Sequence, residues 1–226
     1  MLAQKIYQDH NSVAKLKSMG LSVDNFTFAI SRAIYESRRS SPLHPRTSAM
    51  TRAWEEVVAA FRESVISELK GWNYTFDSGL EYTINSERGL SIIATSGNKD
   101  TGILEGFPKT KNAKGSATED VISRNLGLFG EDDDDDDEYE SEEPEDSIPI
   151  SIDSTQTFVF LYYFDLGAQE VRCELSKPSA MSGFNGQNKI SSWSERIILP
   201  SVPFSAAIET PEKEFNEEID IVVSRK

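Results

Sequence analysis

The chain has 226 residues, 38% of them hydrophobic and 10% aromatic, enough to build a core in one large domain or two small ones. It carries 38 acidic and 23 basic residues, a net charge of −15. No run of about 18 apolar residues predicts a membrane-spanning helix, and the first residues lack the apolar core of a secretory signal. The single cysteine, Cys173, excludes an intramolecular disulfide and favours a reducing compartment, so we expect a cytoplasmic protein.

Helical patterns dominate the first seventy residues. Loosely spaced apolar residues predict a helix over 3–19, ended by Gly20. A second helix is expected to begin near Asp24 and to end before the prolines of segment 41–45. A third helix is predicted to lie on a sheet or on the other two helices. Its apolar residues recur every three or four positions, at Met50, Trp54, Val57, Val58, Phe61, Val65 and Leu69.

The pattern then changes to alternation. Apolar residues at every second position predict strands over 72–76, 80–84 and 90–94, joined by turn residues into an antiparallel meander. Residues 96–116 resemble a long ordered loop. Ser116 and Glu119 match a capping box and predict a short helix that continues to about Asn125.

A tract of extreme acidity follows. Residues 131–146 include thirteen acidic residues, and removing them leaves 25 acidic against 23 basic residues, a net charge of −2. The acidity therefore belongs to one segment. Because this segment has little to bury and repels itself, we expect it to be disordered.

Strand patterns return after the tract. The most apolar run, 157–164, predicts a central strand; 171–175, 190–199 and 219–223 predict three more. The predicted fold class is α+β, with N-terminal helices packed on a mainly antiparallel sheet and a disordered acidic loop inserted. The acidic segment 131–147 either links two domains or interrupts one fold. We favour one fold, in which residues 148–226 complete the sheet begun by residues 1–130.

The acidic segment is the first candidate site. Three roles are open for it: a solubilising linker, a site that engages a basic partner, or a mask over a basic site on its own chain. In the second role its carboxylates would compete with nucleic acid for basic groups. The residues assigned to partner binding are Asp132, Asp133, Asp134, Asp135, Asp136, Asp137 and Glu138.

The second candidate is a lysine loop ahead of the predicted short helix. Lys109, Lys111 and Lys114 lie among glycines and small polar residues, which suits an anion-binding site. The order Lys-Gly-Ser departs from the phosphate-binding Gly-Lys-Ser/Thr, and a solvated basic loop is the alternative.

Other candidates carry weaker patterns. The arginine-rich stretch 32–52 is read as a solvated connection and not as a nucleic-acid surface. Trp193 is expected to pack under the sheet, with Glu195 and Arg196 on opposite sides of their strand. Cys173 is expected to be buried and inert.

Enzyme chemistry has little support, and no cofactor is predicted. The sequence has two histidines and no zinc-ligand cluster. A carboxylate set for a metal-dependent nuclease is left open, with no spacing that selects it from the other acids: Asp77, Glu81, Asp100 and Glu105.

The sequence therefore predicts a non-enzymatic interaction module whose acidic segment engages a basic partner. One alternative is a nucleic-acid-binding or phosphodiester-processing protein that uses the lysine loop, with the acidic run as autoinhibitor. The other is a structural or assembly component.

Overall fold

The protein is described by a computed structural model over residues 4–68, 71–127, 152, 155–184 and 187–209. Its helices are α1 (His10–Ser18), α2 (Val23–Arg38), α3 (Ser48–Glu68) and α4 (Ser116–Asn125). Its strands are β1 (Lys5–Tyr7), β2 (Asn73–Asp77), β3 (Leu80–Asn85), β4 (Leu90–Ser96), β5 (Gln156–Asp165), β6 (Glu170–Ser182), β7 (Lys189–Ile198) and β8 (Val202–Pro203). The α+β fold class is confirmed.

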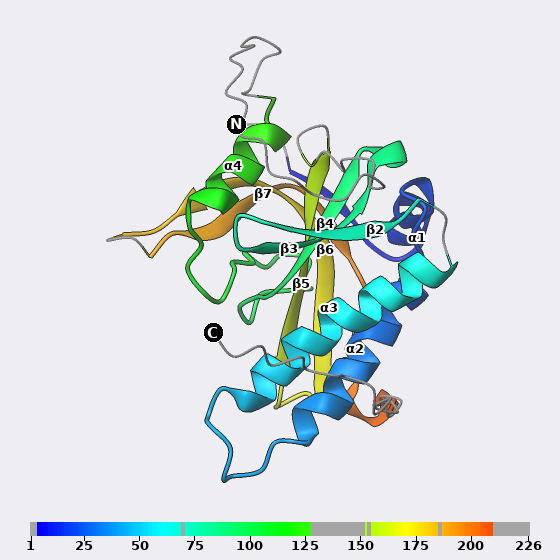
Figure 1. Cartoon of the computed structure of the whole chain (residues 1–226), viewed down its shortest axis with the longest axis vertical. Helices are drawn as coiled ribbons and strands as arrows, with labels where there is room; N and C mark the ends of the chain where they lie inside the picture. Colours follow the sequence, from blue (N-terminus) through cyan, green and yellow to red (C-terminus); the bar gives the residue numbers. More distant parts are fainter. Residues whose placement is uncertain (1–3, 69–70, 128–151, 153–154, 185–186, 210–226) are drawn as a thin grey trace, which may run out of the picture.

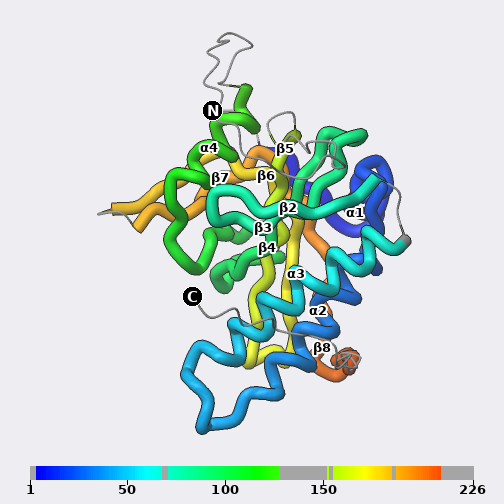
Figure 2. Tube along the Cα trace, in the orientation of Figure 1, coloured from blue at the N-terminus to red at the C-terminus, as the bar shows by residue number. Residues whose placement is uncertain are grey.

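The described strands form one mixed sheet in the order β1-β7-β6-β5-β4-β3-β2, with β8 beside β6 (Figures 1 and 2). The meander β2–β3–β4 is antiparallel, as predicted, and the pairings of β6 with β5, β7 and β8 are antiparallel too. Two pairings are parallel, β1 with β7 and β4 with β5. The prediction of a mainly antiparallel sheet therefore holds only in part. The parallel β4–β5 pair joins strands from the two sides of the acidic segment, and the connection between them contains the 97–115 loop and α4.

The helices α2 and α3 cover one face of this sheet (Figure 1). Phe26 of α2, Phe61 of α3 and Phe160 of β5 meet there, with ring centroids 4.9–5.8 Å apart. All three side chains are buried, so the predicted stripe on the third helix and the predicted central strand form one aromatic core.

The opposite face is covered by α4 and by the 97–115 loop. Val121 of α4 packs in a second cluster with Leu161 of β5 and Trp193 of β7. The buried Trp193 indole donates a hydrogen bond to the Pro108 carbonyl oxygen, 2.8 Å away. The expectation that Trp193 packs under the sheet is therefore confirmed.

The chain differs from the predicted pattern at two helix starts. Residues 5–7 form β1 on the edge of β7, and Asp9, with φ 51°, turns the chain before α1 begins. Pairing with a distant strand overrides local helical spacing here. At α4, Ser116 is already the first helical residue, Gly115 is the N-cap, and no side chain caps it, so the predicted capping box is wrong.

Two further predictions concern residues that the structure does not describe. The strand expected over 219–223 and the acidic segment both lie outside them. Within them, no helix has both the length and the apolar character that a membrane crossing requires.

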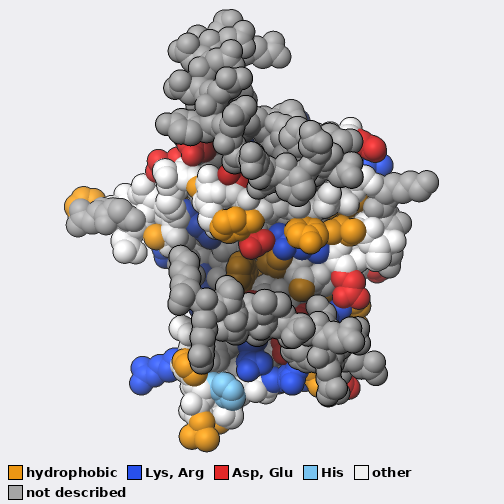
Figure 3. Space-filling model, viewed as in Figure 1, with side chains coloured by type: hydrophobic (Ala, Val, Ile, Leu, Met, Phe, Trp, Pro, Cys, Tyr) orange, Lys and Arg blue, Asp and Glu red, His pale blue; other side chains and the backbone are white. Residues whose placement is uncertain are grey.

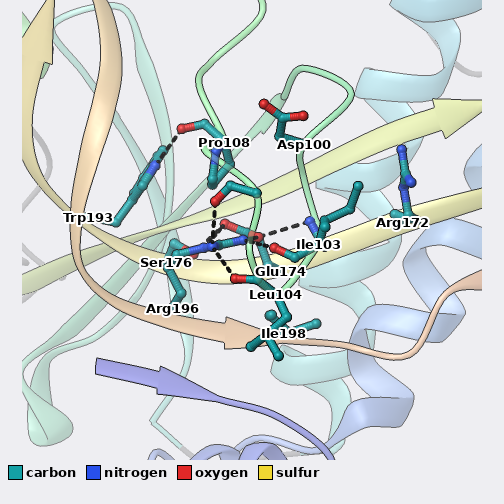
Figure 4. A network of polar contacts seen from close by, with 12 residues as sticks. Asp100, Ile103, Leu104, Pro108, Arg172, Glu174, Ser176, Trp193, Arg196 and Ile198 are labelled. Atoms are coloured by element: carbon teal, nitrogen blue, oxygen red, sulfur yellow. Dashed lines mark hydrogen bonds and ion pairs between the residues drawn. The ribbon is translucent and has the colours of Figure 1, made fainter. Parts of the chain in front are cut away.

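A buried ion pair fastens the 97–115 loop to the sheet (Figure 4). Arg196 of β7 and Glu174 of β6 are both fully buried, and the Arg196 Nε and Nη2 donate to the Glu174 carboxylate at 3.2 and 2.6 Å. The same guanidinium donates to three loop carbonyl oxygens, those of Ile103, Leu104 and Gly106, at 2.9–3.3 Å. Every N–H of Arg196 therefore has an acceptor.

The carboxylate of the pair is equally well satisfied. Glu174 accepts from the backbone N–H of Gly102 at 2.9 Å and from the Ser176 hydroxyl at 2.9 Å, in addition to Arg196. A buried ion pair is tolerated when its remaining donors and acceptors are filled in this way. The pair thus joins the loop to the sheet through hydrogen bonds from both of its members.

We expect Arg196→Ala to lower the free energy of unfolding by about 3–5 kcal/mol, because it leaves the Glu174 charge and three loop carbonyls buried without a donor. The double variant Arg196→Met with Glu174→Leu should recover only part of this loss, since it removes the unpaired Glu174 charge but leaves the three loop carbonyl oxygens without their donor. Urea denaturation of the three proteins measures the difference. A loss below about 1 kcal/mol for Arg196→Ala would contradict the role assigned to the pair.

Candidate anion-binding site

A cleft opens where β3 and β4 diverge. These strands pair only over residues 83–85 and 90–92. Residues 80–82 of β3 stay with β2, while residues 93–96 of β4 continue beside β5. This half of β4 therefore has a ladder partner on one side only among the described strands.

Side chains and loop backbone satisfy part of the open side of β4. The indole N–H of Trp54 on α3 donates to the Ala94 carbonyl oxygen at 3.1 Å. The backbone N–H of Lys111 donates to the Ser96 carbonyl oxygen at 2.8 Å. The first half of α3 and the end of the 97–115 loop thus form two walls of the gap.

The resulting cleft has a volume of about 520 Å³. This falls within the range of small-molecule sites, which is roughly 300–1,000 Å³. One part of its lining is apolar, and the residues that supply it come from α3, β3, β4 and β5: Met50, Trp54, Leu80, Ile93, Ala94 and Tyr162.

Three cations line the same cleft: Arg46, Lys111 and Lys114. Among the described residues, none of the three has a carboxylate within 4.0 Å, whereas Glu81, which also lines the cleft, is held by Arg62 at 2.7 Å. Within the part of the chain that the structure describes, the cleft therefore presents positive charge that no ion pair offsets.

Lys114 is the most constrained of these cations. Its side chain is half-buried, and its Nζ donates to the Thr95 hydroxyl at 3.0 Å. Burial lowers the pKa of Lys114 below its ordinary value of 10.5. An ammonium group held in a desolvated cleft without a counter-ion gains more from a bound anion than a solvated lysine does.

The first turn of α3 adds to the positive potential. Thr47 and Thr51 line the cleft beside Met50, so the N-terminal end of this helix lies at its rim. The first turn of α3 contains no acidic residue that would offset the positive end of the helix dipole.

The structure separates the three predicted anion-binding lysines. Lys111 and Lys114 line the cleft together, but Lys109 is not among the lining residues and its side chain is exposed. The backbone N–H of Lys109 bonds to the Asn98 side chain instead. Sequence reasoning missed Arg46 and Trp54 as cleft residues, because no local signal shows that the start of the third helix faces the end of the third strand of the meander.

The predicted partner-binding residues, 132–138, lie outside the described residues. Their engagement of a basic partner, their mimicry of nucleic acid and their competition for the lysine loop all stay predictions. The described chain comes close together on the two sides of this segment, since Asn125 exchanges two hydrogen bonds of 2.8 Å with the Thr157 backbone.

The arginine-rich stretch is mostly engaged within the fold. Arg32 is buried between Glu56 and Glu63, and Arg39 and Arg52 both approach Glu36. These pairs join α2 to α3 and to the connection between them. Arg46 differs, since it reaches the cleft.

The carboxylates considered for a metal-dependent nuclease do not form a metal-binding group in the described chain. Among the residues searched, no group of three or more His, Cys, Asp or Glu side chains lies close enough to hold a metal ion. Cys173 is fully buried, and burial raises the pKa of its thiol to about 12. Such a thiol carries almost no thiolate near neutral pH, so it is a poor nucleophile.

Comparisons with protein-family models, with curated proteins and with solved structures find no match to this chain. The functional argument therefore depends on the geometry of the cleft.

We expect Lys114→Met to be at least as stable as the unsubstituted protein at pH 7, because it removes a half-buried charge that has no counter-ion among the described residues. The folded state binds Lys114's proton less tightly than the unfolded state does. Stability of the unsubstituted protein should therefore rise as pH increases from the lowered pKa towards 10.5, and the difference between the proteins should narrow.

Urea denaturation at pH 7 and pH 9.5 measures this difference, with Lys109→Met as the matched control on an exposed lysine of the same loop. A marked loss of stability in Lys114→Met alone would show that Lys114 serves the fold and not a ligand.

Proposed function

We propose that the protein is a binding module that holds a small organic anion in the cleft between α3, β4 and the 97–115 loop. The observation that carries this proposal is the half-buried ammonium group of Lys114, which lines the cleft and, among the described residues, has no carboxylate within 4.0 Å. A fold keeps a charge in such a place at a cost to stability, and a functional ligand accounts for that cost.

The lining suggests which parts of a ligand would lie where. The anionic head group would contact Lys111, Lys114 and Arg46, and its charge would complete the ion pairs that the described chain leaves open. The apolar or aromatic body would lie against Met50 and Trp54. The hydrogen bond from Trp54 to β4 fixes the orientation of the indole, so little side-chain entropy would be lost on binding.

The same lining favours binding over catalysis. Neither histidine nor cysteine occurs among the described lining residues, and their one carboxylate, Glu81, is engaged by Arg62.

The dimensions also favour a small ligand over a nucleic-acid strand. A strand needs a groove that follows its backbone over several nucleotides, whereas the three cations converge on one cleft of about 520 Å³. Phosphate and carboxylate head groups satisfy the same cations, so the proposal names the shared chemistry: a single anionic group on an apolar body.

The test uses phenyl phosphate and benzoate as probes, with benzyl alcohol as the uncharged control. Quenching of Trp54 fluorescence or saturation-transfer NMR reports binding. We expect both anions to bind and benzyl alcohol not to bind. We expect Lys114→Met to weaken anion binding about tenfold or more, because it removes a charged hydrogen-bond donor from a desolvated cleft.

Lys109→Met is the matched control, since it makes the same change of charge on the same loop outside the cleft. It should leave probe affinity within about twofold of the unsubstituted protein, because an exposed charge at a distance is screened. The proposal fails if Lys109→Met and Lys114→Met weaken binding equally, or if benzyl alcohol binds as well as the anions.

A further inference from the structure

The edge strand β2 is exposed in the described chain. Among the described strands it is the last of the sheet and pairs only with β3. Tyr74 and Phe76 are 58% and 66% exposed, and Figure 3 shows hydrophobic side chains gathered over the β2–β3 hairpin. Natural sheets protect free edges with lysine, proline or very short strands. The five residues of β2, Asn-Tyr-Thr-Phe-Asp, include neither lysine nor proline.

The hairpin turn fixes which backbone groups face outward. Ser78 and Gly79, with φ of 49° and 80°, form a two-residue turn of the kind that makes the flanking residues a hydrogen-bonded pair. Asp77 therefore directs its N–H and C=O towards β3, and by alternation Tyr74 and Phe76 direct theirs away from it. The Tyr74 N–H accordingly bonds to the side chain of Asn73, at 2.8 Å, and not to β3.

Two copies of β2 placed antiparallel to each other have complementary side chains. In an antiparallel pair centred on Thr75, Tyr74 lies opposite Phe76 of the other strand, and Thr75 lies opposite Thr75. Asn73 lies opposite Asp77, so an amide can donate to a carboxylate. Each directly opposed pair is of a favourable kind, and no like charges face each other.

We propose that β2 is a self-association surface, at which two copies of this chain pair their β2 strands antiparallel about a two-fold axis through Thr75. The outward N–H and C=O groups of Tyr74 and Phe76 bond to those of Phe76 and Tyr74 in the second copy, and the Tyr74 N–H gives up its bond to the Asn73 side chain to do so. The aromatic rings pack on the face of the sheet where the Arg62 guanidinium already lies 4.9 Å from the Tyr74 ring centroid. This surface goes beyond the proposed anion binding and does not depend on it.

The opposite edge of the sheet is a poor alternative. β1 has only three residues, and one of them is Lys5. Its one aromatic residue, Tyr7, is partly buried, whereas Phe76 of β2 is 66% exposed. A second copy bonds to the outward backbone groups of β2 with its own β2, which gives a closed two-fold dimer. Dimers of this kind are the commonest soluble oligomers. The acidic net charge of −15 opposes association, so the dimer is expected to tighten as salt rises.

The experiment measures the sedimentation of the full chain by analytical ultracentrifugation over a concentration series in 0.15 M NaCl. The unsubstituted protein should show a monomer–dimer equilibrium. Thr75→Lys and Thr75→Glu place like charges opposite each other at the axis, and each alone should raise the dimer dissociation constant about fivefold or more. An equimolar mixture of the two variants should restore the dimer, because Lys then faces Glu.

Phe184→Ala is the control, since it removes an 80% exposed aromatic away from β2 and should leave the dissociation constant unchanged. Should the charged variants fail to fold, as judged by circular dichroism, Phe76→Ala provides the same test by weakening the aromatic pair. A chain that stays monomeric at the highest concentration, or a dimer that persists in the charged variants, would overturn the proposal.

Discussion

The architecture around the cleft depends on one buried ion pair. Glu174 and Arg196 face the side of the sheet that the 97–115 loop covers, and Arg196 donates to the loop carbonyl oxygens of Ile103, Leu104 and Gly106. Burying both charges costs free energy, because both side chains are removed completely from water. The cost is offset because each hydrogen-bonding group of the two side chains has a partner. The same loop carries Lys111 and Lys114 at its far end, so the pair in the core positions the cations of the cleft.

The cleft follows from the way the sheet is joined. β4 must pair in parallel with β5, whereas β3 follows β2 into a tight hairpin, and the two demands draw β3 and β4 apart beyond Ile92. Trp54 and the Lys111 backbone fill part of the gap with hydrogen bonds to β4. The remaining space is where an apolar wall meets cations that have no ion pair within the described chain, and this combination suits an amphipathic anion.

Local patterns predicted the elements better than their connections. The spacing of apolar residues located α3 and the three strands of the meander, because burial of one face dictates that spacing. The parallel β4–β5 pairing, the strand at residues 5–7 and the partner of Arg196 depend on contacts between distant parts of the chain, which no local pattern encodes. For the same reason the loop composition pointed to Lys111 and Lys114, but it could not separate them from Lys109 or add Arg46 and Trp54.

The most direct test of this account is amide hydrogen exchange in the Arg196→Met, Glu174→Leu double variant, followed by mass spectrometry of peptides from the 97–115 loop. If the pair holds the loop, these peptides should exchange much faster than in the unsubstituted protein, while peptides from β5 and β6 keep their protection. Unchanged protection of the loop would contradict the account, because the loop would then be held in place without Arg196.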